Sequence, residues 1–314
     1  MPTIVATDSP SRPVVFVTVT AGGGTRDTPQ QLAAGIAAFS NALNTLISTG
    51  RNVLVSVNLS NVPATGSPDP LTQCLVPLGI QVDSGRPLLR SEKIDTRTVA
   101  SPRIDVLDPH ADHPIAKAIN GLRLRLQWPV TINADTPAAG VHVQPLVTLP
   151  ADGALWTESE WQQFYGLVGQ VKGDYTRIAN PPVKDSARDG TAPGAGWTLA
   201  LAAEVEKSGG GARGRQRVVV VGANGWFLDD LTDAVGTVDG RQVAFFPGNL
   251  QLLESAVTWL AGQDDQILRS ASVASAPTIP ALSPTQQAWM RWLLVVVLPA
   301  LVLAAGAAYR LLRP

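Results

Sequence analysis

The sequence predicts an α/β layered domain with a mostly parallel sheet, followed by one C-terminal transmembrane helix. Strand-like apolar runs alternate with amphipathic helical stretches through most of the chain, which favours an α/β class. A strand, a helix and a second strand follow one another within residues 14–60, and this unit favours parallel pairing through a right-handed crossover. Near the C-terminus, residues 292–309 form an uncharged run. As a helix this run would rise roughly 27 Å, close to the ~30 Å hydrocarbon core of a bilayer.

The first strand–helix–strand unit is marked at each of its boundaries. The apolar run Val14–Thr20 predicts a buried strand, and Thr28 and Pro29 supply the N-cap and first position of a helix. Gly50 ends that helix, and Arg51–Ser60 predicts the second strand. The apolar side chains of the helix recur at spacings of four and three, which places them on one face: Leu32, Ile36, Phe39, Leu43 and Leu46.

The middle of the chain contains shorter elements. Turn residues and apolar periods predict helices at 71–78 and 115–119, a short strand from residue 80, and strands at 122–130 and 141–149. Residues 84–113 are polar and carry no clear period. If the domain consists of two subdomains, we expect the break near residues 122–196.

Two strands and a helix complete the domain. Trp197–Glu206 and Arg215–Gly222 predict strands separated by a glycine-rich turn, and the second is the most apolar strand, so we expect it at the centre of the sheet. Asn249 is expected to cap a helix that Gly262 ends. Its predicted apolar stripe consists of Leu250, Leu253, Val257 and Leu260.

The predicted boundaries divide the chain into five parts. They are an N-terminal segment at 1–13, the α/β domain at 14–262, a linker at 263–283, the membrane helix at 284–310 and a short tail at 311–314. Aromatic rings prefer the headgroup layer, and small residues permit close approach of another helix. The membrane anchor is therefore assigned to Trp289, Trp292, Pro299, Gly306, Tyr309 and Arg310. A buried core helix is the alternative for this run.

The composition argues against several classes of function. The net charge of −1 gives no electrostatic case for nucleic acid as a partner. A single cysteine, Cys74, excludes an internal disulfide and a cysteine-based zinc site. Because Cys74 lies among leucines and no histidine is near it in sequence, we interpret it as a buried thiol rather than a nucleophile.

The segment Asp108–His113 is the one cluster with metal-ligand residue types. Its two histidines and two aspartates could hold a divalent ion, but Pro109 and Pro114 indicate a turn. No G-x-S-x-G elbow occurs in the chain. We therefore assign no catalytic residue, no metal ligand and no cofactor.

Two glycine-containing loops follow predicted strands, where anion-binding loops occur in α/β proteins. Gly22 and Gly23 follow the first strand, and Gly222 and Asn224 follow the most apolar strand. The P-loop and dinucleotide-binding spacings are absent from the first loop. A tight turn explains the first loop, and a strand-to-helix turn fits the second as well as a ligand site does.

Six short motifs occur in the order found in a known family. They are GRNVLVSVNLS at 50–60, SPDPLTQCLVPLGIQV at 67–82, DHPIAKAING at 112–121, RQRVVVVGANGWFLDD at 215–230, GNLQLLESAVTWLAGQDD at 248–265 and LSPTQQAWMRWLLVVVLPALVLAAGAAYRLLR at 282–313. Together they resemble the GldG-like auxiliary components of ABC-type transport systems, a family associated with gliding motility. Ala223 and Gly225 stand where the family usually has an acidic pair. The family usually carries an N-terminal membrane helix as well, so we expect this chain to correspond to a C-terminal part or a shortened relative.

The resemblance implies a flavodoxin-like or amidotransferase-like α/β domain without an established catalytic role. It further implies ABC permease and ATPase subunits as partners at the lipid bilayer. Two alternatives remain, a membrane-anchored hydrolase and a small-molecule sensor. We expect a single-pass protein of the bacterial inner (cytoplasmic) membrane, and Arg310 and Arg313 against Arg291 favour a cytoplasmic C-terminus with the domain outside. The alternative topology is a tail anchor with the domain in the cytoplasm.

Overall fold

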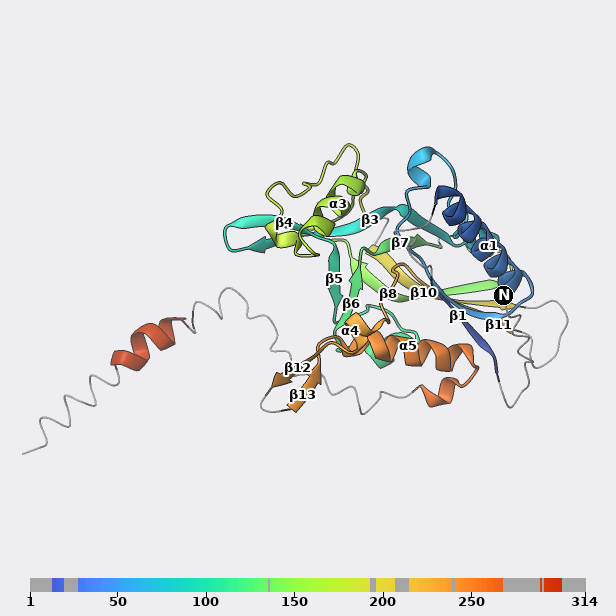
Figure 1. Ribbon diagram of the computed structural model, residues 1–314. Coiled ribbons are helices and arrows are strands. Elements are labelled where there is room, and N and C mark those ends of the chain that lie inside the picture. The colour runs from blue at the N-terminus through green and yellow to red at the C-terminus, as the bar shows by residue number, and fades with distance from the viewer. Residues whose placement is uncertain are drawn as a thin grey trace, which may run out of the picture. The chain divides into compact units, whose positions relative to one another are not determined.

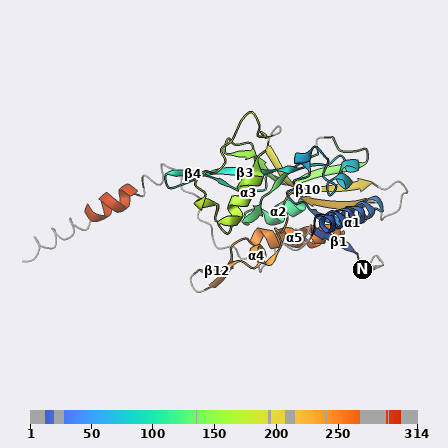
Figure 2. The same cartoon turned by 45° about the horizontal axis from the view of Figure 1, so that its top comes forward.

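The computed structural model describes residues 13–19, 28–134, 136–192, 196–206, 215–238, 241–267, 289 and 291–300. The chain divides into two units, Met1–Ser275 and Ala276–Pro314. The first unit confirms the mixed α/β class, because helices cover both faces of a five-stranded sheet (Figures 1 and 2).

The five-stranded sheet is mixed rather than mostly parallel. Its order is β1-β2-β11-β10-β8, and it consists of β1 (Val15–Val19), β2 (Asn52–Ser56), β11 (Arg215–Val221), β10 (Gly196–Glu206) and β8 (Val141–Pro150). The β1–β2 and β2–β11 pairings are parallel, whereas β11–β10 and β10–β8 are antiparallel. The chain between β10 and β11 is too short for the crossover that a parallel pair requires. The predicted central position of β11 is confirmed.

Alternate residues of the central strands point into two separate cores. On one face, Val53 and Val220 pack with Leu43 of α1 (Pro29–Ser48). Thr28 caps this helix and Pro29 lies in its first turn, as predicted, and Gln31 completes a capping box with Thr28.

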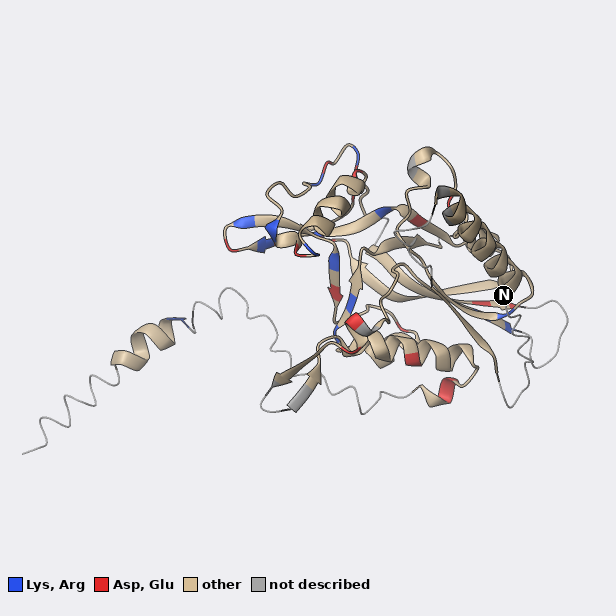
Figure 3. Cartoon of the chain, in the orientation of Figure 1, with Lys and Arg blue, Asp and Glu red and all other residues tan. Residues whose placement is uncertain are grey.

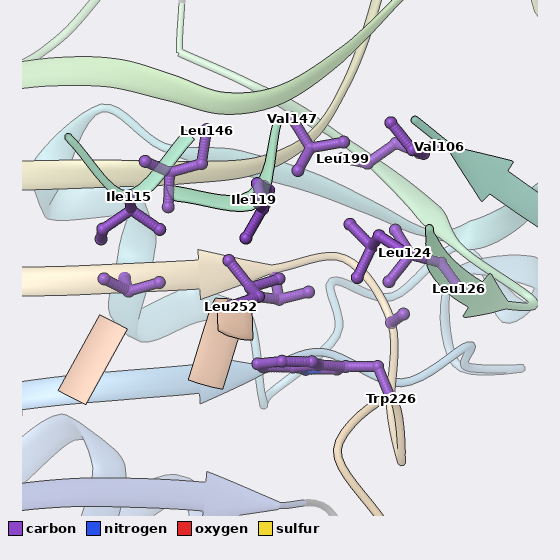
Figure 4. Packing of buried hydrophobic residues seen from close by; sticks show 14 of the residues in the cluster. Val106, Ile115, Ile119, Leu124, Leu126, Leu146, Val147, Leu199, Trp226 and Leu252 are labelled. Carbon is purple, nitrogen blue, oxygen red and sulfur yellow. The ribbon is translucent and has the colours of Figure 1, made fainter. Parts of the chain in front are cut away.

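The opposite face of the sheet carries α2 (Pro114–Ile119) and α5 (Pro247–Leu260). Leu252 of α5 packs with Ile115 and Ile119 of α2 in the core that also holds Leu54, and Figure 4 shows Leu252 between these side chains and Trp226. The first unit therefore has three layers, with the five-stranded sheet between two layers of helices.

Helix α5 corrects two expectations. It begins at Pro247, so Asn249 lies inside its first turn instead of capping it. The predicted stripe is also wrong, because Leu250, Leu253 and Val257 are only partly buried. The buried face instead consists of Asn249, Leu252, Ser255, Ala256, Trp259 and Leu260. Because the buried face includes an asparagine and a serine, the spacing of apolar residues alone does not identify it.

Residues 84–113, which have no clear sequence period, belong mainly to three strands. They are β3 (Gln81–Ile94), β4 (Arg97–Ser101) and β5 (Arg103–Val106). Strand β3 pairs with β4, β7 (Val130–Asn133) and β9 (Leu155–Thr157), and β5 pairs with β6 (Leu124–Gln127). Helix α3 (Trp161–Gln170) packs on this second sheet through Phe164.

Smaller elements complete the first unit. They are 3-10 helices at Pro63–Thr65, Gln73–Leu78, Tyr175–Arg177 and Asp264–Gln266, helix α4 (Asp229–Thr232) and the hairpin of β12 (Val235–Val238) and β13 (Arg241–Ala244). The helix predicted at 71–78 is thus a 3-10 helix that starts at Gln73, contains Pro77, and ends at Gly79 with a φ of 77°.

The second unit is described only at residues 289 and 291–300. They are helical, with a π-helical turn at Leu293–Val297. Trp289, Trp292 and Pro299 of the predicted anchor lie here, whereas Gly306, Tyr309 and Arg310 lie outside the described residues. Within the part of the chain that the structure describes, no helix is long and apolar enough to cross a membrane.

Candidate functional site

The three parallel strands end at one edge of the five-stranded sheet, where open α/β sheets bind their ligands. The loop after β1, with Gly22 and Gly23, lies outside the described residues. The loops after β2 and β11 are described, and each contacts the second sheet. Ser60 N donates to Ser84 O of β3 at 2.8 Å, and Val130 N of β7 donates to Gly222 O at 2.6 Å.

Gly222 is fixed by the close approach of two strands. Its N–H donates to Leu199 O of β10 at 2.8 Å. A Cβ at this position would lie 2.1 Å from Val130 O, so a larger residue would push β7 away. The backbone groups of Gly222 are therefore used within the fold. Asn224 lies half-buried in the same turn.

The turn after β11 is held by a buried polar network. Trp226 is fully buried, and its Nε1 donates to Ser56 Oγ at 3.0 Å. Asn249 Oδ1 accepts from Arg125 N, and Asn249 Nδ2 donates to the backbone oxygens of Arg125 and Trp226. One asparagine thus joins α5, β6 and this turn, which makes the turn rigid.

A polar cavity lies next to this turn, between β3, β7 and the start of β10. It opens because the β3–β7 pairing shifts between Val82↔Ile132 and Pro87↔Val130. Over this interval β3 advances five residues and β7 only two, so β3 bows outward as in a bulge. The cavity has a volume of about 390 Å³ and is lined by Gln81, Val82, Asp83, Arg86, Thr131, Ile132, Asn133, Thr157, Gly190, Thr191, Trp197 and Thr198.

Trp197 differs from the other buried indoles around the site. Its side chain is 2% exposed, and its Nε1 is buried without a hydrogen-bond partner among the described residues. By contrast, Trp161 Nε1 donates to Gly85 O at 2.7 Å and Trp226 Nε1 donates to Ser56. A buried donor without an acceptor costs about 1–3 kcal/mol, and the Trp197 ring packs in the core that also holds Leu54.

The rim of the cavity carries an ion pair. Arg86 Nε and Nη2 lie 2.8 and 2.7 Å from Asp83 Oδ2. The opposite wall is a bridge in which Thr157 and Gly190 exchange backbone hydrogen bonds. A Cβ on Gly190 would lie 2.1 Å from Thr157 Oγ1 and 3.7 Å from Arg86 Nη1. A larger residue at this position would therefore clash with the Thr157 side chain.

The structure does not bring the four metal-ligand residue types of the Asp108–His113 segment to one point, because Asp108 and His110 contact each other while Asp112 and His113 have other partners. His113 is buried, its Nδ1 accepts from Ile115 N as the N-cap of α2, and its ring meets Trp259 edge-on. Burial lowers the pKa of His113 to about 4. Asp112 points to solvent and pairs with Lys117 at 2.6 Å. The described residues contain no group of three potential metal ligands.

Cys74 is held in the core against α1. Its Sγ lies 3.5 Å from Leu71 O, and burial raises the pKa of the thiol to about 12. Cys74 is therefore protonated near neutral pH and packs as an apolar side chain.

Two charged clusters stabilise the face that carries α5. Asp105 of β5 receives hydrogen bonds from Arg123 and Arg125 of the neighbouring strand region (Figure 3), and the Arg125 guanidinium lies 4.2 Å from the Phe246 ring centre. Burial alone would raise the pKa of Asp105, but the two arginines outweigh it and hold the pKa low. Arg217 similarly pairs with Glu204 and Asp264. The charged side chains of both clusters are thus paired with one another.

No family model matches the chain, and no curated protein or solved structure matches it. Function is therefore assigned from the geometry and from the sequence motifs. The cavity residues escaped prediction because they come from five separate segments with no shared motif. Asp83 and Arg86, which lie three residues apart and carry opposite charges, are a local signal of the pair at the rim.

Proposed function

We propose that this protein is a non-enzymatic accessory subunit of an ABC-type transport complex of the gliding-motility kind. In this proposal residues 284–310 anchor the chain in the bacterial inner membrane. The α/β domain binds a partner or substrate at the membrane surface beside the permease and ATPase. The single observation that carries the proposal is that family-like motifs distant in sequence meet in one structural unit.

The meeting of these motifs can be followed residue by residue. The motif at 50–60 forms β2, and it pairs in parallel with β11 of the motif at 215–230, with Val53 opposite Val218. The motif at 112–121 contributes His113, whose ring contacts Trp259 of the motif at 248–265. These contacts place the motifs in one folded unit, as a single family pattern requires.

The finer fold proposal is a flavodoxin-like or amidotransferase-like core. Three adjacent parallel strands with helices on both faces are what this domain shares with such folds. The antiparallel strands β10 and β8 extend that core and carry the connection to the second sheet.

The state of the titratable side chains supports a binding role. His113 is neutral and caps a helix, and the Cys74 thiol is buried and protonated. The cavity between β3, β7 and the start of β10 supplies a place for a small molecule. It favours small-molecule sensing as the second candidate function.

Co-purification from native membranes tests the proposal. The tagged full chain is extracted from the source organism in a mild detergent and its companions are identified by mass spectrometry. We expect an ATPase and a multi-span permease in amounts comparable to the chain. An unrelated tagged single-span protein serves as the control. A chain that elutes alone in several detergents would count against the proposal.

Topology requires a separate measurement, because the complex could form with either orientation. We expect the domain outside the cytoplasm and the C-terminus inside. Protease added to intact spheroplasts should then degrade the domain and leave a C-terminal tag protected. Protection of the domain until the cells are lysed would favour the tail-anchored alternative.

A further inference from the structure

Strand β1 is an edge strand of the five-stranded sheet (Figure 1), and it pairs with β2 alone among the described strands. Its sequence is VFVTV, which contains neither a charged residue nor a proline. The strand at the opposite side of the sheet, β8, contains Pro145 and Pro150, which cannot donate backbone hydrogen bonds to a further strand. An uncharged edge strand offers its outward N–H and C=O groups to another strand. The backbone chemistry of β1 therefore selects a β-strand as its partner.

The middle of β1 exposes an apolar residue. Val15 packs against the core that holds Leu54, whereas Phe16 packs against the core on the α1 side. Because successive side chains of a strand point to opposite faces, Val17 lies on the same face as Val15. Val17 is nevertheless 42% exposed. Pairing with a second strand would remove this apolar surface from water, which is favourable.

The residue types of β1 occur in nearly the same order in both directions. When two copies of β1 pair antiparallel with Val17 at the centre, Val17 lies opposite Val17, Val15 opposite Val19, and Phe16 opposite Thr18. Pairs of an aromatic and a β-branched residue, such as Phe16 with Thr18, are among the cross-strand pairs that stabilise sheets. A two-fold axis, the commonest symmetry of dimers, makes such a strand pair antiparallel. Strand β1 is therefore complementary to itself.

Helix α1 fits the same symmetry. Its twenty residues include no ionisable side chain, whereas a protein surface is normally charged at about a quarter of its positions. The exposed positions in its first half are small residues: Ala33, Ala34, Gly35, Ala37 and Ala38. Helix α1 packs on the face of the sheet to which Phe16 points. A two-fold axis perpendicular to the sheet keeps both copies of α1 on that face, where they meet without repulsion between like charges.

We propose that two copies of this chain associate through antiparallel pairing of β1, with the two-fold axis at Val17. The two five-stranded sheets then form one continuous sheet. The backbone of β1 supplies the hydrogen bonds, Val17 becomes buried, and the uncharged surface of α1 flanks the strand pair. This inference goes beyond the accessory-subunit proposal, because the pairing requires neither a permease nor an ATPase.

Cysteine cross-linking tests the pairing in the full chain, purified in a mild detergent. Opposite residues of an antiparallel pair have Cα atoms about 4.5–5.5 Å apart, which suits a disulfide. Under mild oxidation, Val17→Cys should form about tenfold more covalent dimer on a non-reducing gel than Val235→Cys. Val235 is the matched control because it is an exposed valine in a strand of another sheet. The native Cys74 is buried and remains in all variants.

A pair of variants tests the register. Val15→Cys and Val19→Cys should cross-link to each other when the two chains are co-expressed, because these positions lie opposite each other across the axis. Either variant alone should not cross-link, since its two cysteines would lie about 13 Å apart along the strands. Equal cross-linking in the co-expressed pair and in the single variants would contradict the two-fold register.

A charge at the centre of the strand should separate the copies. Val17→Lys places two ammonium groups opposite each other, so we expect association to weaken by about fivefold or more. Sedimentation of the detergent-solubilised chain over a concentration series measures the change. Val17→Thr keeps an uncharged β-branched side chain and should retain the dimer. A circular dichroism spectrum like that of the unmodified chain verifies that each variant is folded.

Four results would overturn the inference. They are sedimentation as a single chain throughout the series, unchanged association in Val17→Lys, equal cross-linking of Val17→Cys and Val235→Cys, and cross-linking of Val17→Cys in native membranes mainly to another protein. The last result would show that a strand of a different partner pairs with β1. Failed cross-linking with an ATPase and permease still co-purifying would reject the dimer and leave the accessory-subunit proposal standing.

Discussion

Two buried tryptophans at the same edge of the sheet show how differently neighbouring regions of this domain are built. Around Trp226, Ser56 and Asn249 complete a closed hydrogen-bond network in the core. Around Trp197, β3 leaves β7, a polar cavity opens, and the indole N–H finds no acceptor among the described residues. The first arrangement stabilises the fold. The second leaves a buried donor unpaired among the described residues.

Removing the centre of the closed network should have the largest effect. Asn249→Ala deletes three hydrogen bonds and leaves backbone groups of Arg125 and Trp226 buried without partners. We expect a loss of about 3–5 kcal/mol in the free energy of unfolding, measured by urea denaturation. Asn41→Ala, on the exposed face of α1, is the control and should change stability by less than about 0.5 kcal/mol. A loss below about 1 kcal/mol in Asn249→Ala would contradict the network.

Acid should lower the free energy of unfolding through protonation of His113. Its pKa is lowered to about 4 in the folded protein, against about 6.5 when unfolded, so the unfolded chain binds the extra proton between these values. The contribution of neutral His113 to the free energy of unfolding is therefore fully present above pH 6.5. It is lost as the pH falls toward 4, by about 3 kcal/mol in total. Urea denaturation across this range measures it. His113→Asn keeps a capping side chain without titrating, and an unchanged slope in that variant would assign the acid sensitivity elsewhere.

A matched pair of substitutions compares the two indoles directly. Trp226→Phe and Trp197→Phe remove the same atoms from buried sites, but only the first breaks a hydrogen bond, to Ser56. We expect Trp226→Phe to cost about 1–3 kcal/mol more in unfolding free energy. Trp161→Phe, which loses a bond to Gly85 O, should behave like Trp226→Phe. Equal costs for all three would mean that the Trp197 N–H has an acceptor in the purified protein.

The smallest effect is expected at the rim of the cavity. Asp83→Asn should change the free energy of unfolding by less than about 0.5 kcal/mol, because its pairing with Arg86 is solvent-exposed. Asp105→Asn, at the better buried pairing with Arg123 and Arg125, should cost more than 1 kcal/mol. Thermal unfolding of both variants gives the comparison. A large loss in Asp83→Asn would mean that the rim pair stabilises the fold.

Local chemistry explains why parts of the fold were predictable. The Thr28-Pro29 start of α1, the positive-φ glycines that follow helices, and the buried runs of β2 and β11 each depend on residues close in sequence. The β3–β5 region was missed because many of its side chains are partly exposed polar residues, which give no hydrophobic period. Asn249 was misassigned as a cap because its actual partners, Arg125 and Trp226, are distant in sequence.

The sequence by itself determined that this chain forms an α/β domain with β11 at the centre, because strand burial and helix caps are local properties. The pairing of β8 with β10, the closed network around Trp226 and the polar cavity beside Trp197 were decided only by the tertiary structure. Each of these needs segments far apart in the chain to meet in a particular register. A register shift of a few residues between β3 and β7 opens the cavity, and such a shift depends on how both strands pack rather than on either segment alone.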